Sequence, residues 1–336
     1  MLVEIREAPA TVERQAAVLA GPLAELVARL DRAPPRVAVT CARGSSAHAA
    51  TFGKHLIERH LGIPVAAAAP NIGTVYGRSL QLDGQLFLAI SQSGRSDDLV
   101  EQMRRARAAG AVTAALVNAT DSPLADASEI VLPMQAGPER SVAATKSFIA
   151  SAAALLRLVA LWTGDAVMAA SLDRLPERLA AATTLDWHEA VERLRDSASL
   201  VAIGRGPTLA IAREAALKLK ETCNVHAEAF SGAEFLHGPV ALVDELYPIL
   251  MFVPSDAARS GLRELATNLL GKGASLLVAE PGPAAAGRLP SLEADHPDAD
   301  AICMIQSFYG MVERLAVLRG VDVDRPRHLQ KVTRTR

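Results

Sequence analysis

Short apolar segments alternate with longer segments of helical pattern along this chain, and this alternation constrains the fold more than any other feature. The apolar segments of the first half are Val37–Thr40, Pro64–Ala67, Leu86–Ile90, Val112–Val117 and Ile130–Leu132. Helical patterns follow at about Ala47–His60, Asp97–Ala109 and Thr145–Thr163. Strands that alternate with helices form a parallel sheet covered on both faces. We therefore expect an α/β fold built on a doubly wound parallel sheet.

The second half repeats this plan, and 336 residues are enough for roughly two domains. Leu200–Gly206 matches Val37–Gly44, Pro248–Ser255 matches the segment around Leu86–Ser91, Glu264–Gly273 matches Glu101–Gly110, and Ser275–Val278 matches the fourth strand. Two tandem copies of one domain are the simplest interpretation. The predicted division is a helical segment (1–35), a first domain (36–165), a helical connector (166–190), a second domain (191–324) and a tail (325–336).

Composition excludes several classes of protein. Half of the residues are hydrophobic and 21% are charged, which is typical of a globular chain with ample core. The net charge of −2 gives no reason to expect nucleic acid as a partner. Three cysteines lie far apart in the sequence, which favours reduced thiols in a cytoplasmic protein. An acidic start with a proline excludes a secretory signal, and polar residues interrupt every apolar run, so we expect no membrane span.

Serine-rich turns follow two of the predicted strands. Ala42–Ser46 reads ARGSS, and Ser91–Ser96 reads SQSGRS directly before a helix. Serine caps helices and glycine makes turns, so an ordinary strand-to-helix loop is one interpretation. The alternative is an anion site, because hydroxyls and free N–H groups at a helix start bind phosphate. Ligands of open parallel sheets lie beyond the carboxyl ends of the strands, and the second copy has the poorer turn Pro254–Ser260, PSDAARS.

Charged residues of the predicted helix Leu209–Thr222 form a second candidate site. Glu214, Lys218 and Glu221 are spaced i, i+4 and i+7, so they share one helix face. A solvated ion pair explains the same spacing. The polar segment that follows, residues 224–239, is predicted to be a shaped loop that contains His237.

Other patterns do not support a cofactor or a metal. The spacing of Glu234 and His237 occurs in metal-binding helical bundles, but Gly232 and Gly238–Pro239 break any long helix here. Gly204–Arg205–Gly206 lacks the third glycine of a dinucleotide-binding turn, and no P-loop is present. We expect no cofactor and no metal.

Five segments together resemble a known family. They are CARGSS, SQSGRS, AATKSF (Ala143–Phe148), ALKLKETCNVHAEAFSGAEFLHGPVAL (Ala216–Leu242) and GVDVDRPRHLQKVT (Gly320–Thr333). The chain resembles the sugar-isomerase (SIS) family, in particular the isomerase half of glucosamine-6-phosphate synthase. The resemblance covers almost the whole chain, and its KLKE, HAEA and HGP segments are highly specific. It implies two tandem SIS domains, the first of which binds a phosphosugar.

The resemblance also implies a reaction. No glutaminase half is present to deliver ammonia, so the expected direction is deamination: an amino-sugar 6-phosphate and water give fructose 6-phosphate and ammonia. The chain is most similar to the SIS-type glucosamine-6-phosphate deaminases, and Arg95 stands where the synthases carry an acidic residue. Arg43 and Ala144 replace cysteine and serine of the synthases, which bears on sugar specificity. The alternatives are another phosphosugar isomerase, a fructosamine-6-phosphate deglycase, a glutaminase-lacking aminotransferase or a sugar-phosphate sensor.

The resemblance assigns roles to individual residues. The phosphate- and sugar-binding positions are Gly44, Ser45, Ser46, Ser91, Gln92, Ser93 and Ser96. Glu221 matches the carboxylate that moves a proton between C1 and C2, and Lys218 stabilises the charge beside it. His237 matches a ring-opening histidine donated by a neighbouring subunit, which implies a homodimer with active sites at the interface. Lys331 matches the tail lysine that forms a Schiff base with the ketose in the synthases; in a deaminase it either forms this bond or only holds the substrate, with the tail closing the site.

Overall fold

The computed structural model describes residues 1–283, 285 and 287–331, and the chain folds into two compact units. The first-sheet unit contains Ala10–Glu139, Lys146–Leu172 and, of its last segment, Gln330 and Lys331. The second-sheet unit contains Met1–Pro9, Arg140–Thr145 and Asp173–Leu329. Two helices, α1 (Leu2–Arg32) and α7 (Ala166–Thr183), contribute residues to both units.

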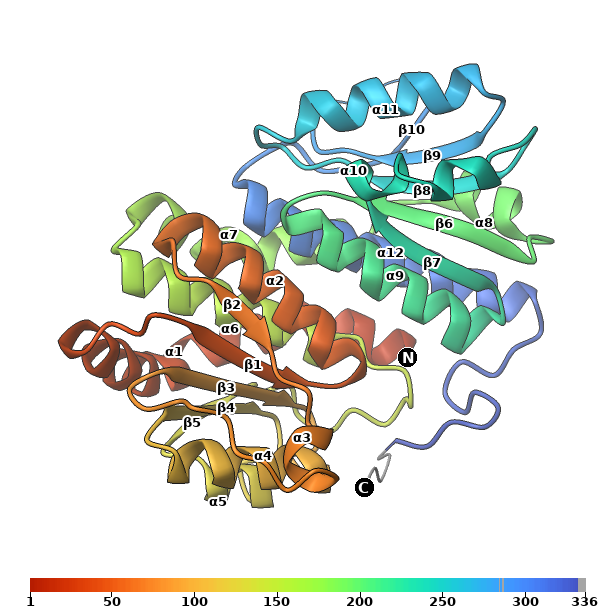
Figure 1. Ribbon diagram of the computed structural model, residues 1–336. Coiled ribbons are helices and arrows are strands. Elements are labelled where there is room, and N and C mark those ends of the chain that lie inside the picture. Colours follow the sequence, from red (N-terminus) through yellow and green to blue (C-terminus); the bar gives the residue numbers. More distant parts are fainter. Residues whose placement is uncertain (284, 286, 332–336) are drawn as a thin grey trace. The chain divides into compact units, whose positions relative to one another are not determined.

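A five-stranded parallel sheet forms the first-sheet unit, in the order β2-β1-β3-β4-β5. Its strands are β1 (Ala38–Ala42), β2 (Val65–Ala67), β3 (Leu86–Ser91), β4 (Val112–Val117) and β5 (Ile130–Pro133). Its shorter helices are α3 (Asn71–Thr74), α4 (Asp97–Ala108) and α5 (Pro123–Ala127), and its longer ones are α2 (Gly44–Leu61) and α6 (Lys146–Thr163). The helices α2 and α6 pack together on one face, and α4 and α5 lie on the other (Figure 1). The predicted doubly wound architecture is confirmed.

The strand order places a topological switch point between β1 and β3. After β1 the chain crosses to β2 on one side, and after β2 it returns to β3 on the other side. The register pairs Ala42, the last residue of β1, with Ile90 of β3, so both strands end at the same edge. The crevice at such a point is where open α/β sheets bind ligands. The two serine-rich turns leave the sheet at this edge.

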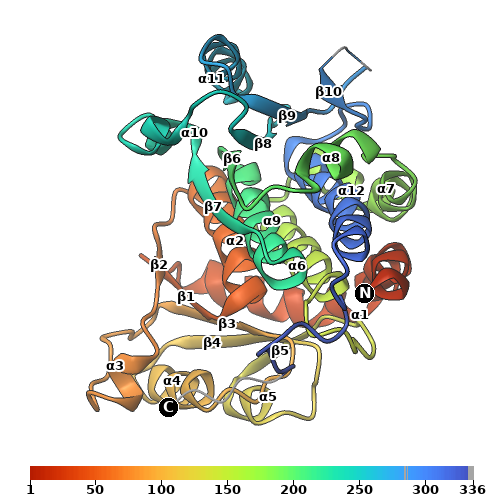
Figure 2. The same cartoon turned by 90° about the vertical axis from the view of Figure 1, so that its right-hand side faces the viewer.

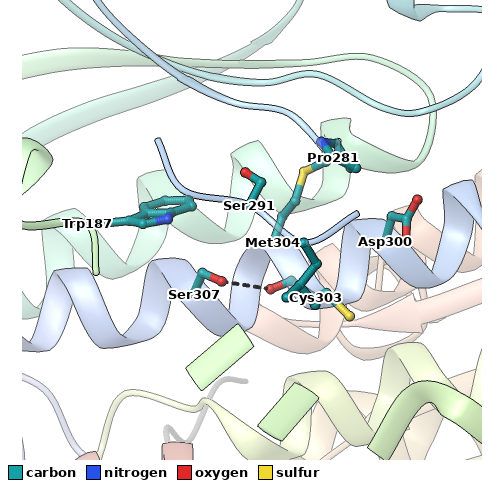
Figure 3. Close-up of a pocket in the computed structure, with 8 residues that line it drawn as sticks. Trp187, Pro281, Ser291, Asp300, Cys303, Met304 and Ser307 are labelled. Carbon is teal, nitrogen blue, oxygen red and sulfur yellow. Dashed lines mark hydrogen bonds between the residues drawn. The ribbon is translucent and has the colours of Figure 1, made fainter. Parts of the chain in front are cut away.

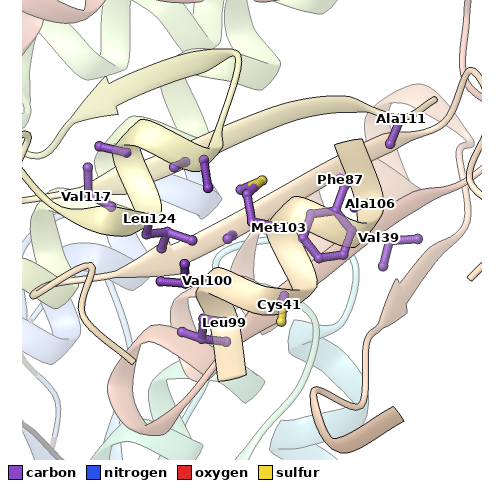
Figure 4. Close-up of a cluster of buried hydrophobic side chains, with 14 of the residues drawn as sticks. Val39, Cys41, Phe87, Leu99, Val100, Met103, Ala106, Ala111, Val117 and Leu124 are labelled. Atoms are coloured by element: carbon purple, nitrogen blue, oxygen red, sulfur yellow. The ribbon is translucent and has the colours of Figure 1, made fainter. Parts of the chain in front are cut away.

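Apolar packing between the sheet and α4 fixes this edge. Phe87 of β3 and Met103 of α4 are fully buried in one cluster, together with Leu99 and Leu124 (Figure 4). Side chains of α4 spaced three and four residues apart supply the helical part of the cluster, as expected for an amphipathic helix on a sheet. Burial of this cluster holds the first turn of α4 directly beyond the end of β3.

The second-sheet unit repeats the same topology, because its order is β10-β9-β8-β6-β7. Its strands are β6 (Ser199–Gly204), β7 (His226–Ser231), β8 (Pro248–Phe252), β9 (Ser275–Ala279) and β10 (Arg288–Leu289). Its helices are α8 (His188–Leu194), α9 (Pro207–Cys223), α10 (Gly232–Phe235), α11 (Arg259–Gly271) and α12 (Pro297–Leu318), with a 3₁₀ turn η1 (Pro239–Leu242). The helix α12 packs against both α8 and α9 (Figure 2). The predicted duplication is therefore confirmed at the level of strand order.

One sequence prediction about this unit is wrong. The segment His226–Ser231 was expected to be part of a polar loop, and it is the edge strand β7, paired with β6. Of its six residues only Ala227 is fully buried, and the others are partly or fully exposed. An edge strand needs few apolar residues because one side of it faces solvent. The pairing with β6 therefore decides its conformation.

Within the described part of the chain, two helices, α6 and α12, are long and apolar enough to cross a membrane by length and composition. Of the most apolar window, 78% is buried in α6 and 72% in α12. Helices that are apolar on all sides and covered by protein belong to the core. Both are buried core helices.

Candidate active site

The turn after β3 is held in one conformation by its own hydroxyls and by the neighbouring loop. The Ser91 hydroxyl accepts a hydrogen bond from the Gly94 backbone N–H (3.1 Å). The Gln92 carbonyl accepts from the backbone N–H groups of Asn118 and Ala119, both at 3.3 Å. Gly94 has a φ of +62°, and a Cβ there would collide with Ser122. Glycine is therefore required for both its left-handed backbone and its small size.

Both helices that start at this edge lack a side-chain cap. The residue before α2 is Arg43 and the residue before α4 is Ser96, and neither side chain accepts a hydrogen bond from its helix. In α4 the Leu99 N–H already donates to Oδ1 of Asp98 (2.9 Å), so the start of α2 with Ser45 and Ser46, together with Ser93 in the turn after β3, suits a phosphate better. The predicted phosphate residues Gly44, Ser45, Ser46, Ser91, Gln92, Ser93 and Ser96 all lie in these two turns at one sheet edge.

An ion pair that the sequence did not predict connects the two turns. The Arg43 guanidinium donates from Nε (3.2 Å) and Nη2 (2.8 Å) to one oxygen of Asp98. Asp98, in the first turn of α4, is 2% exposed, whereas Arg43 is 52% exposed. A buried carboxylate needs a partner, so the pair fixes the start of α2 relative to the start of α4. The sequence contained a hint, because Arg43 replaces a cysteine of the synthases it resembles.

On α9, Lys218 lies between two carboxylates. Its Nζ is 3.4 Å from Glu214 and contacts Glu221 more closely. Lys218 and Glu214 are 0% exposed, and Glu221 is 21% exposed. Tyr309 of α12 donates a hydrogen bond to Glu214 (3.2 Å). The alternative of a solvated surface pair is wrong for Lys218 and Glu214, and Glu221 is the member of the group that reaches solvent.

His237 is exposed and lies between α10 and η1. Its backbone N–H donates to the Glu234 carbonyl (3.0 Å), and Gly238, with a φ of +142°, turns the chain into η1. A shaped turn is therefore present, as expected. Its predicted role in a neighbouring subunit's site stays a prediction. Among the described residues, no three His, Cys, Asp or Glu side chains gather closely enough to hold a metal ion.

Lys331 contacts a buried carboxylate within the first-sheet unit. Its Nζ lies 3.1 Å from Oε2 of Glu139, whose side chain is 0% exposed. Glu139 also accepts from the Ser147 hydroxyl (2.7 Å) and from the Ser147 backbone N–H (3.1 Å) at the start of α6. No sequence motif points to Glu139, although its partner Ser147 belongs to the AATKSF segment. Residues 332–336 of the predicted tail lie outside the described residues.

A small cavity elsewhere in the second-sheet unit is not a sugar site. It measures about 10 Å³ and is lined by Trp187, Asp300, Cys303 and Ser307, among others (Figure 3). This volume holds about one water molecule. Burial raises the pKa of the Cys303 thiol to about 12, so it is not a nucleophile at neutral pH.

Comparison with known proteins identifies the family. A model of the SIS domain matches residues 34–161 and 193–279. The glutamine–fructose-6-phosphate aminotransferase (isomerizing) of Caulobacter vibrioides is 31% identical over 305 residues, which cover 86% of this chain and 50% of that protein. The chain thus spans about half the length of the curated relatives that it matches.

Two solved structures share the fold over nearly their whole length. One is from Silicibacter pomeroyi DSS-3 and is provisionally described as a phosphosugar isomerase; it has 44% identity and a TM-score of 0.91, covering 96% of this chain and 99% of that chain. The glucosamine-6-phosphate deaminase of Thermotoga maritima has 21% identity and a TM-score of 0.73, covering 98% and 100%. With two five-stranded parallel sheets of the same order and a family model that matches most of its length, this chain belongs to the SIS domain family.

Proposed function

We propose that this chain is a phosphosugar isomerase that moves a proton between C1 and C2 of a hexose 6-phosphate. We further propose that the substrate is an amino-sugar 6-phosphate and that ammonia is released. The observation that carries the proposal is the group on α9, in which buried Lys218 contacts the partly exposed Glu221. The family and the phosphosugar-isomerase description of the Silicibacter pomeroyi protein support the substrate class.

The group on α9 suits proton transfer. A carboxylate that reaches solvent can take a proton from C2 and return it to C1, and one group suffices for both steps. Lys218 cannot leave its position, because it is buried between Glu214 and Glu221. Its positive charge would stabilise the negative charge that develops on the substrate during transfer. The reaction class is therefore enolisation next to a carbonyl.

The serine turns of the first-sheet unit suit a phosphate group. Ser45, Ser46 and Ser93 offer hydroxyls, and the uncapped start of α2 offers backbone N–H groups. Together these donors match the oxygens of a phosphate group. Contacts to the phosphate group would stabilise the bound substrate and the transition state equally. Losing them would therefore change KM more than kcat.

Two residues have proposed supporting roles. His237 is exposed and would protonate the ring oxygen to open the sugar, donated by the neighbouring subunit of a homodimer. Lys331, with its charge balanced by Glu139, would hold the open-chain sugar. Neither role needs a metal or an organic cofactor.

The chemistry of the amino sugar gives the finer proposal. Removal of the C2 proton from the open-chain amino aldose and its return to C1 leave an imine at C2. Water then adds to the imine carbon, and ammonia leaves, so that a ketose 6-phosphate remains. A hexose 6-phosphate with a hydroxyl at C2 would pass through the same proton transfer and give an isomer without ammonia. One catalytic group thus serves both reactions.

The test is a substrate panel with two readouts, ammonia and fructose 6-phosphate. Glucosamine 6-phosphate should give both products in equal amounts, and glucose 6-phosphate at most fructose 6-phosphate. If fructose 6-phosphate forms but no substrate releases ammonia, the chain is an isomerase and the deaminase proposal is rejected. Ammonia or free amine from fructosamine 6-phosphate alone would favour a deglycase. Binding of these sugars without turnover or C2 proton exchange in deuterated water would reject the enzyme and favour a sensor.

A further inference from the structure

Three arginines converge on one buried carboxylate in the second-sheet unit. Glu280 follows β9 directly, and its side chain is 1% exposed. Arg259 and Arg263 of α11 and Arg288 of β10 all contact it. Arg263 lies 2.8 Å (Nε) and 2.6 Å (Nη2) from Oε1 of Glu280, and Arg288 lies 3.1 Å from Oε2. We call these four residues the arginine cluster.

The arginine cluster carries more positive charge than its carboxylate balances. Three guanidinium groups surround one carboxylate, although one bidentate arginine already matches a carboxylate in geometry and charge. The side chains of Arg259, Arg263 and Arg288 remain 30%, 48% and 28% exposed, so part of each guanidinium faces solvent. Glu280 fixes one edge of each arginine, and Arg259 also donates from Nη2 to the Pro281 carbonyl (2.7 Å), so the donors that face the groove are those of Arg263 and Arg288.

A groove of about 520 Å³ leads from the arginine cluster along β9. Leu276, Val278 and Glu280 point to the same face of β9, because side chains alternate along a strand. The helix α11 lies beside this face and adds Leu270 to the groove (Figure 1). The volume is in the range of small-molecule sites, which combine an apolar lining with a few polar groups. The groove thus has an apolar floor and a cationic end.

The arginine cluster lies next to a turn of the second sheet that has a counterpart in the first sheet. The turn Pro254–Ser260 follows β8 and corresponds to the serine-rich turn after β3 in the first sheet. By sequence this turn is the poorer of the two in anion-binding residues. Its Arg259 joins Arg263, Arg288 and Glu280 in space, and these come from separate elements. The turn after β8 therefore contributes an arginine, Arg259, where the corresponding turn of the first sheet contributes serines.

We propose that this groove binds a small organic phosphate. Arg263 and Arg288 bind the phosphate, and the apolar or aromatic part of the ligand lies on Leu270, Leu276 and Val278. The site is distinct from the proposed sugar site and does not depend on the proposed function. A nucleoside monophosphate has the required combination of a phosphate and a planar group.

Isothermal titration of the full chain with AMP, inorganic phosphate and adenosine tests both ends of the groove. AMP should bind more tightly than either of its parts. Arg263→Gln and Arg288→Gln should each weaken AMP and phosphate binding by about tenfold or more, because each removes charged hydrogen bonds. Leu270→Ala should weaken AMP binding without changing phosphate binding.

Controls separate this site from folding defects and from the serine turns. Each single arginine variant keeps two arginines on Glu280, so its thermal unfolding should stay close to that of the parent chain. Arg314→Gln, at a 59% exposed arginine paired with Asp186, should bind AMP normally. Absence of AMP binding would overturn the proposal. So would AMP binding that survives both arginine substitutions, or that is lost in the Ser91→Ala, Ser93→Ala double variant and unchanged in Arg263→Gln.

Discussion

At the scale of single residues, burial decides how strongly the charged side chains of α9 interact. Lys218 and Glu214 would be an ordinary helical ion pair at a surface, worth a few tenths of a kcal/mol. At 0% exposure, each charge depends on its partners, because a buried charge left alone is costly. The burial also keeps Lys218 in place beside Glu221, which is the one member of the group that reaches solvent. Packing around α9 therefore fixes the position of the Lys218 ammonium group next to Glu221.

Substitution of Glu221 by glutamine should abolish most of the turnover. The amide keeps the shape and a hydrogen bond to Lys218 but cannot take a proton, and general acid–base catalysis contributes roughly 10²–10⁴-fold. We expect kcat to fall by about that factor with little change in KM, and C2 proton exchange in deuterated water to fall equally. Glu192→Gln, at an exposed glutamate of α8, is the matched control. Near-normal turnover in Glu221→Gln would reject the proposed base.

Asp300 should make stability depend on pH. Burial raises the pKa of its carboxyl above the ordinary value of 3.8, although Ser255 and Arg178 donate hydrogen bonds to it. The folded state therefore holds the proton more tightly than the unfolded state. The resulting stability is fully present below 3.8 and is lost as pH rises through the raised pKa.

Asp300→Asn should remove this dependence, because the amide does not titrate. Urea unfolding from pH 3.5 to 7 should show a smaller fall in the free energy of unfolding for the variant than for the parent chain over the interval just above 3.8. Identical slopes in the two proteins would show that the folded-state pKa of Asp300 is not raised.

At the scale of elements, the strand-to-helix turns are the parts that depend most on context. The turn after β3 is fixed by backbone hydrogen bonds to Asn118, Ala119 and Leu124 and by the contact of Gly94 with Ser122. The turn after β1 is fixed by the ion pair between Arg43 and Asp98. Each turn is therefore ordered before a ligand arrives, which lowers the entropic cost of binding.

Gly94→Ala should destabilise the turn after β3 by more than the backbone cost of an alanine at positive φ. An alanine at a φ of +62° costs roughly 1–2 kcal/mol, and here its Cβ would also collide with Ser122. Gly77 has the same φ of +62° with open space around it, so Gly77→Ala measures the backbone cost by itself. We expect Gly94→Ala to lower the melting temperature more than Gly77→Ala and to raise KM for the sugar phosphate. Equal effects on stability would contradict the close contact.

At the scale of the whole molecule, the chain is two copies of one topology with different chemistry at each sheet edge. The first sheet presents serines and backbone N–H groups, and the second presents the arginine cluster. The serine turns lie at the switch point of the first sheet, between β1 and β3, whereas the arginine cluster gathers at the end of β9, one strand away from the equivalent point between β6 and β8. Fold and function are separable here, because the residues in the turns decide what a crevice binds.

The proposed donation of His237 by a neighbouring subunit predicts complementation between inactive variants. Glu221→Gln and His237→Ala should each be nearly inactive. Co-expression of the two chains should restore about a quarter of the parent activity, because half of random dimers are mixed and each mixed dimer has one intact site. No recovery, with mixed dimers verified by tagged pull-down, would place His237 in the site of its own subunit or outside catalysis.

The sequence by itself determined the architecture, because the signals for it are local. Apolar runs such as Leu86–Ile90 and amphipathic helices such as α4 follow from the periodicity of neighbouring residues. The duplication and the place of both serine turns at one sheet edge follow from the same pattern. Glu221 and Lys218 were found because their spacing is a property of a single helix.

Only the tertiary structure decided which charges are buried and which residues meet across long distances in sequence. Asp98 reaches Arg43, Glu139 reaches Lys331, and Glu280 gathers three arginines, although no local pattern connects these residues. The strand β7 forms because β6 offers it hydrogen bonds, not because its residues prefer a strand. Long-range pairing and desolvation are properties of the packed chain, so the sequence alone could name candidate residues but not their environments.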